Sequence, residues 1–152
     1  MSKAFGVNVM GIDKLRTKFA NAPEKVENEL KNIVNDTLAA IEAKAKNRVA
    51  VGKTGKLKAS IKMSKFTMPN GGYVSAGNKN VIYAPFVEFG TGNKFGLRNY
   101  SNLNYKTLLD YAYTFKRIPP KKNVNLPYRP FLFSSASEEI GLMIERLKKI
   151  TI

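Results

Sequence analysis

Two segments of the chain carry residue types that could support chemistry. The first, residues 49–54, reads Val-Ala-Val-Gly-Lys-Thr and ends like a phosphate-binding loop, in which backbone amides and a lysine hold phosphate groups. A complete motif needs glycine at position 47, where this chain has Asn47, and a buried strand before the loop. The preceding residues have instead the pattern of a long helix. We therefore interpret this segment as a helix end and disfavour a nucleotide site.

The second candidate is Glu88, the only acidic residue between Glu42 and Asp110 in the sequence. A lone carboxylate among aromatic side chains could be an acid of raised pKa. No second carboxylate lies near it in the sequence to complete a catalytic pair. We therefore favour a structural role, in which Glu88 pairs with a neighbouring lysine or arginine or caps a backbone turn.

The chain contains neither histidine nor cysteine. It therefore lacks the commonest general base, the usual metal ligand and the thiolate nucleophile, and it cannot form disulfides. These absences argue against an enzyme, a metal site and a bound cofactor. A nuclease or hydrolase that relies on clustered carboxylates is also disfavoured, because residues 51–126 contain only Glu88 and Asp110 as acids.

Positive charge is concentrated in the middle of the chain. The net charge is +15, from 26 basic and 11 acidic residues, and eleven of these fifteen charges fall in residues 51–126. Such a surface can simply be solvated, but the local excess indicates a face that meets a polyanion, either nucleic acid or an acidic protein surface. The candidate contacts are Lys94, Arg98, Lys106, Lys116, Arg117, Lys121 and Lys122.

The spacing of apolar residues predicts an α+β fold. Apolar residues recur every three or four positions from Val26 to Val49 and predict a long amphipathic helix that begins near Asn21. Alternation then predicts a hairpin of two strands, residues 57–67 and 73–76, joined by a turn at 68–72. A third strand is predicted over residues 81–89.

The remaining segments complete this expected architecture. We predict a short helix at 11–19, an inserted arm at 93–126 with its own short helix from Tyr105 to Phe115, a brief strand at 131–133 and a final helix from about residue 134. The two long helices should pack on a small antiparallel sheet within one domain, residues 1–152, in which residues 1–20 form an N-terminal segment. No apolar run approaches the roughly 18 residues of a membrane span, so no membrane partner is expected.

Three short motifs lie in order along the chain. The first is Thr-Gly-Lys-Leu-Lys-Ala-Ser-Ile at 54–61, the second Tyr-Ala-Pro-Phe-Val-Glu-Phe-Gly-Thr-Gly at 83–92, and the third Arg-Pro-Phe-Leu at 129–132. Together they resemble the HK97 gp10-like family of tailed-phage proteins. The residues that carry the resemblance are Thr54, Gly55, Leu57, Ser60, Ile61, Tyr83, Ala84, Val87, Glu88, Phe89, Gly90, Thr91, Pro130 and Phe131.

The resemblance implies a structural virion protein of a tailed bacteriophage, assembled in the host cytoplasm. It implies a tail-completion or neck subunit at the head–tail junction, with no catalytic activity, in a homo-oligomeric ring of six or twelve copies between the portal-side connector and the tail. Sheet edges and an arm with a flexible root at residues 90–92 would contact neighbouring phage proteins, and the arm could contact genomic DNA in the channel. The alternative is a sequence-independent nucleic-acid-binding protein.

Overall fold

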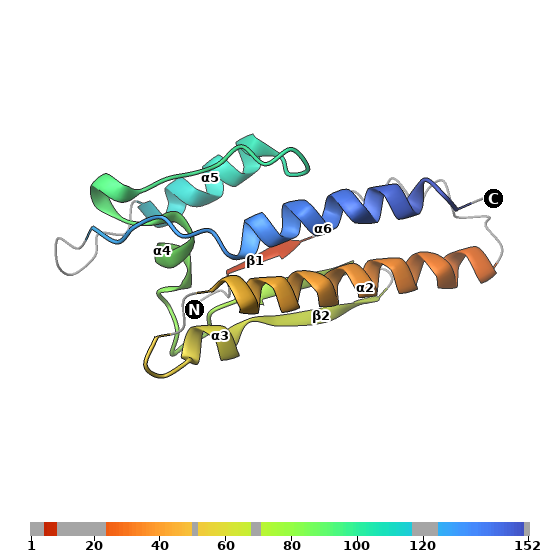
Figure 1. Ribbon diagram of the computed structural model, residues 1–152, viewed down its shortest axis with the longest axis horizontal. Coiled ribbons are helices and arrows are strands. Elements are labelled where there is room, and N and C mark those ends of the chain that lie inside the picture. Colours follow the sequence, from red (N-terminus) through yellow and green to blue (C-terminus); the bar gives the residue numbers. More distant parts are fainter. Residues whose placement is uncertain (1–4, 9–23, 50–51, 68–70, 117–124, 151–152) are drawn as a thin grey trace.

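A computed structural model describes residues 5–8, 24–49, 52–67, 71–116 and 125–150 (Figure 1). The predicted helix at 11–19 and the predicted N-cap Asn21 lie outside the described residues. The elements are, in order, β1 (Phe5–Asn8), α2 (Glu24–Arg48), α3 (Lys56–Ser60), β2 (Lys62–Thr67), β3 (Gly71–Ala76), α4 (Ala84–Phe89), the 3-10 turn η1 (Gly92–Lys94), α5 (Tyr105–Lys116) and α6 (Leu132–Leu147). The predicted α+β class is confirmed.

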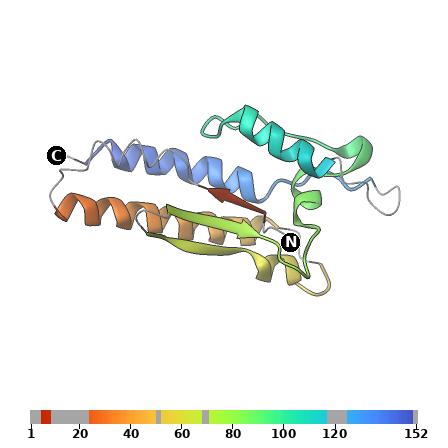
Figure 2. The same cartoon turned by 180° about the vertical axis from the view of Figure 1, so that it is seen from behind.

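The long helix α2 forms as its apolar spacing predicts, and it packs against the antiparallel helix α6 (Figures 1 and 2). Its buried stripe includes Leu30, Val34, Leu38 and Ile41, each at most 2% exposed. Acidic residues lie in its first turn and basic residues in its last turn, the arrangement that the helix dipole favours. None of the described helices is long and apolar enough to cross a membrane.

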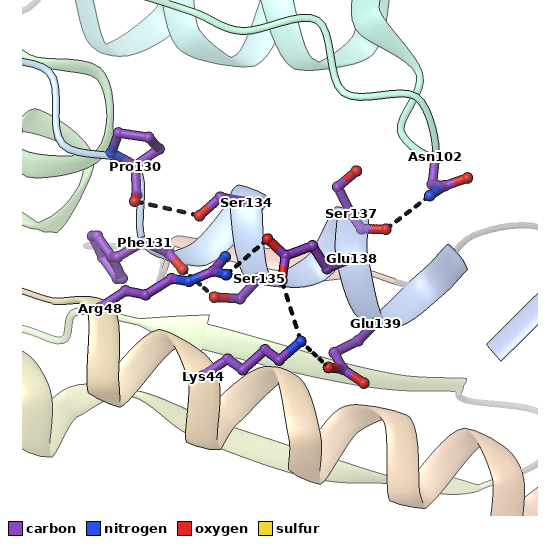
Figure 3. Close-up of polar contacts among 10 residues, drawn as sticks. All are labelled: Lys44, Arg48, Asn102, Pro130, Phe131, Ser134, Ser135, Ser137, Glu138 and Glu139. Carbon is purple, nitrogen blue, oxygen red and sulfur yellow. Dashed lines mark hydrogen bonds and ion pairs between the residues drawn. The ribbon is translucent and has the colours of Figure 1, made fainter. Parts of the chain in front are cut away.

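Charged side chains join α2 to α6 along one side of this helix pair (Figure 3). Arg48 Nη2 lies 2.7 Å from Glu138 Oε1, and Lys44 Nζ lies 2.5 Å from Glu139 Oε1 and 3.2 Å from Glu138 Oε2. The hydrogen bonds from Arg48 and Lys44 hold the pKa of Glu138 below its usual value. Because Glu138 is exposed, its ion pairs with Arg48 and Lys44 add little stability.

The sheet has the order β1-β3-β2, and both pairings are antiparallel. In the central strand β3, Gly72, Val74 and Ala76 are buried, while Tyr73 is 50% exposed on the opposite face. Helix α2 packs against β2 and β3, so it covers the face on which Val74 lies. The strand β1 has no counterpart among the elements predicted from the sequence.

Side chains from helices occupy backbone amides of both outer strands. On β2, the Met63 amide donates to Glu42 Oε2 at 2.9 Å and the Phe66 amide donates to Asn35 Oδ1 at 2.8 Å. On β1, the Gly6 amide donates to the Tyr111 hydroxyl at 3.3 Å. These contacts protect the strands against pairing with other chains. The expectation that the sheet edges are free to pair with neighbouring subunits is therefore wrong at these three amides.

Three predicted strand segments are helical or lead into a helix. Residues 56–60 form α3, because the buried Leu57, Ser60 and Ile61 also fit the spacing of a helix turn. Residues 84–89 form α4, whose first turn accommodates a proline. The third segment is the predicted strand at 131–133. There α6 begins at Leu132, two residues before the predicted start, and no strand precedes it in the described segment 125–131. The strand β2 consequently spans only Lys62–Thr67.

Replacement of Gly72 by alanine should destabilise the protein. A Cβ at this position would lie 2.5 Å from Leu38 Cδ1 and 3.0 Å from Phe66 Cα. The Leu38 side chain and the backbone of β2 would therefore have to shift away from β3. Overpacking of this kind costs about 1–3 kcal/mol. Gly52→Ala is the matched control, because nothing lies within 4 Å of its Cβ position. Urea unfolding of both variants measures the difference, and equal stabilities would contradict the packing described for α2 on the sheet.

Candidate functional site

The Glu88 carboxylate lies at the first turn of α6 and accepts three backbone hydrogen bonds there. Oε2 accepts from the amides of Phe131 at 2.8 Å and Leu132 at 2.9 Å, and Oε1 accepts from the amide of Phe133 at 3.0 Å. The first amides of a helix have no partner within the helix, and its N-terminus favours negative charge. Glu88 thus caps α6 from the separate helix α4. We call this arrangement the Glu88 cap.

The expectation that Glu88 has a structural contact is confirmed in the form of backbone capping. No ion pair between Glu88 and a lysine or arginine is found in the described part of the chain. The side chain is 1% exposed, and burial raises the pKa of its carboxyl to about 7, although the three amide donors act in the opposite direction. A raised pKa alone would suit an acid catalyst.

The surroundings of Glu88 do not form a catalytic site. Its two oxygens are occupied by amides and are shielded from water. Within the described ranges, no group of three or more His, Cys, Asp or Glu residues could hold a metal ion. The arrangement can orient a helix and satisfy its first amides, and this is the chemistry that the geometry supports.

The base of the arm lies beside the Glu88 cap and is held by hydrogen bonds. The Arg129 amide donates to the Val87 carbonyl at 3.1 Å. Thr91 and Leu126 exchange two bonds, one between backbone groups at 3.0 Å and one from the Leu126 amide to Thr91 Oγ1 at 2.9 Å. Gly90 has φ +71°, and a Cβ there would lie 2.8 Å from the nitrogen of Tyr128. These bonds tie Thr91 to the segment before α6, while the flexibility expected of residues 90–92 stays a prediction.

The described part of the arm folds back onto the core. The ring of Phe89 lies 6.3 Å from Phe95, 6.5 Å from Phe115 and 5.7 Å from Phe133, measured between centroids. Further along, Asn102 Nδ2 donates to the carbonyl of Ser137 on α6 at 2.9 Å (Figure 3). The predicted helix of the arm is confirmed as α5, but it is packed against the protein and does not project from it.

Polar contacts join two of the three sequence motifs and anchor the other one. The Glu88 cap joins the second motif to the third. Ser60 of the first motif accepts a hydrogen bond from the Gly77 amide at 2.9 Å and thereby fixes α3 to the end of β3. Of the motif residues, Leu57, Ser60, Ile61, Ala84, Glu88, Phe89, Gly90, Thr91 and Phe131 are buried, Gly55, Val87 and Pro130 are partly buried, and Thr54 and Tyr83 are exposed.

The arm residues proposed as polyanion contacts are only partly described. Lys94, Arg98 and Lys106 are exposed. Lys116 ends α5, and Arg117, Lys121 and Lys122 lie outside the described residues. The structure therefore does not bring the seven candidates together as one surface. The candidates predicted from the sequence do not include the exposed lysines of residues 53–79, although the absence of acidic residues there is a usable signal.

The fold is that of a small α+β protein, and the buried carboxylate of Glu88 has a structural role in it. Residues 13–90 match the family described as "Bacteriophage HK97-gp10, putative tail-component", which is just over half of the chain. The chain therefore belongs to this family of phage tail components. The match ends at Gly90, where α4 ends and the arm begins, so the third motif lies outside it. No curated protein and no solved structure matches the chain.

Glu88→Ala should be strongly destabilising because it leaves three buried amides without an acceptor. Each unsatisfied buried group costs about 1–3 kcal/mol, so we expect a loss of at least about 3 kcal/mol in the free energy of unfolding. Glu88→Gln should be intermediate, because its amide nitrogen cannot accept a bond. Glu145→Gln, on the exposed side of α6, serves as the control. A Glu88→Ala variant within about 0.5 kcal/mol of the wild type would contradict the cap.

The Glu88 cap should also leave a signature in the pH dependence of stability. Its folded pKa of about 7 lies above the ordinary 4.5, so the folded state binds a proton more tightly than the unfolded state. The stabilisation that comes from this proton is therefore fully present below pH 4.5 and is lost as the pH rises through about 7. Urea melts across this range should show a decline in the wild type that Glu88→Gln lacks. Parallel profiles for the two proteins would refute the raised pKa.

Proposed function

We propose that this protein is a structural virion component at the head–tail junction of a tailed phage. It acts there as a tail-completion or neck subunit and assembles as a homo-oligomeric ring between the portal-side connector and the tail. The observation that carries this proposal is the family match over residues 13–90, because that family consists of phage tail components. Assembly takes place in the host cytoplasm, and the working protein resides in the virion.

The described surface supports self-assembly through side chains and not through strand pairing. Helix side chains occupy amides of both outer strands. Among the large apolar side chains that are exposed, Ile82 (65%) and Tyr83 (39%) lie before α4, and Leu142 (52%) lies in the second half of α6. These elements lie toward opposite ends of the molecule (Figure 1). A ring needs two different patches that meet head to tail, and this pair provides them.

Substitutions in either patch should disrupt the ring without unfolding the subunit. We expect Ile82→Ser and Leu142→Ser each to reduce the mass measured by light scattering from that of a closed ring to that of a monomer. The matched control is Tyr105→Ser on α5, which removes a side chain of similar exposure, 42%, outside both patches. Circular dichroism verifies that all three variants are folded. A wild-type protein that stays monomeric at every concentration would contradict self-assembly.

The position in the virion is tested with phage that lack this gene. We expect filled heads and separate tails to accumulate, and we expect supply of the protein from a plasmid to restore complete, infectious particles. Electron microscopy of the lysates distinguishes this result from a loss of tails or heads. If phage that lack the protein formed normal particles, the proposed position at the junction would be refuted.

A further inference from the structure

One end of the molecule carries a group of exposed lysines that come from four different segments. Lys53 lies in the loop after α2, Lys56 and Lys58 lie on α3, Lys62 begins β2, and Lys79 lies in the turn after β3. All five side chains are exposed. We call this group the lysine corner. In both views α3 and the segment that leaves β3 lie at the same end of the protein (Figures 1 and 2).

The backbone beneath the lysine corner is held by specific bonds. Ser60 Oγ donates to the Leu57 carbonyl at 2.7 Å and accepts from the Gly77 amide, so it joins α3 to the turn that contains Lys79. That turn is closed by an antiparallel bridge between Asn78 and Val81, and Gly77 has φ +89°. Lys56, Lys58 and Lys79 are therefore carried by backbone that these bonds hold in place.

Among the described residues, no carboxylate forms an ion pair with the lysine corner, although Glu42 interacts electrostatically with Lys62. The sequence contains no acidic residue between Glu42 and Glu88. Glu42 already pairs with Lys46 and accepts from the Met63 amide, and Glu88 is buried in its cap. On α2, by contrast, Lys44 and Arg48 form ion pairs with α6. The ion pairs found among the described residues include none of the five corner lysines.

We propose that the lysine corner binds the phosphate backbone of double-stranded DNA without sequence preference. Five like charges at one end of the molecule repel one another, and a polyanion would relieve this repulsion. The composition favours DNA over an acidic protein, because the cores of protein–protein interfaces are depleted in lysine, whereas DNA interfaces are strongly positive. Lysine ammonium groups suit phosphate oxygens as point charges, and contacts to phosphate carry no sequence information. The proposal stands on this surface alone and does not depend on the ring.

The test is the binding of the full-length protein to a fluorescein-labelled duplex, followed by anisotropy over a range of salt concentrations. Contacts to five phosphates predict a slope of log K against log salt of about −4 to −5. The triple variant Lys53→Gln, Lys56→Gln, Lys58→Gln should lose at least about tenfold in affinity. Its salt dependence should become shallower by about 3 units of slope, one for each lysine removed. Two duplexes of unrelated sequence should bind equally.

The matched control has the same net charge and changes exposed lysines elsewhere. It is the triple variant Lys25→Gln, Lys148→Gln, Lys149→Gln, for which we expect less than about a threefold loss. An equal loss in both triple variants would show a general charge effect and overturn the proposal. Light scattering on the same samples shows whether oligomerisation changed, so failure of the ring and failure of DNA binding are distinguishable.

Two further results would also overturn the proposal. If Lys94→Gln, Arg98→Gln, Lys106→Gln abolished binding while the lysine-corner variant did not, the arm would be the DNA contact. If the wild type bound polyglutamate with this salt dependence but did not bind the duplex, the occupant would be an acidic protein surface.

Discussion

The contact on which most of this structure depends is the Glu88 carboxylate at the start of α6. It satisfies three amides that lie 43 to 45 positions further along the chain, and it does so from a helix of only six residues. A short helix of this kind has little stability of its own. The cap therefore stabilises both helices at once, and it fixes where α6 begins relative to the rest of the core.

The position of α6 then determines the contacts around it. Because α6 begins beside α4, the segment before it runs next to α4 and closes the base of the arm through Thr91 and Leu126. Further along the same helix, Glu138 and Glu139 come to lie opposite Lys44 and Arg48 of α2. The aromatic side chains of the arm and of α6 meet around Phe89. A single buried carboxylate thus links the motif at residues 83–92, the arm and the long helix pair.

The sequence predicts those parts whose period is unambiguous. The long stripe of α2, the central strand β3 and the helix α5 are all predictable because each repeats one spacing over enough residues. The short segments that form α3 and α4 are wrongly predicted as strands, because Leu57, Ser60 and Ile61 fit both periods and residues 83–89 are nearly all apolar. The strand β1 depends on pairing with β3, about 70 residues away, and its four residues carry no period of their own.

The candidate site, like the fold, is predictable where the signal lies in neighbouring residues and not where distant segments meet. That Glu88 has a structural contact can be inferred from its isolation, but its partners are backbone amides, which every residue except proline provides and which leave no signal in side-chain types. The charge count likewise identifies the excess of basic residues in 51–126, but it cannot say which of these residues lie near one another in the fold. The fold separates an arm that packs on the core from the lysine corner, because it brings the turn after β3 next to α3.

Hydrogen exchange at the amides of Phe131, Leu132 and Phe133 in the wild-type protein tests the Glu88 cap most directly. If the carboxylate holds these amides, they should exchange only through global unfolding, as slowly as the central residues of α2. Exchange as fast as that of an unprotected, solvent-exposed amide would show that the first turn of α6 is open, and it would contradict the central role of the Glu88 cap in this fold.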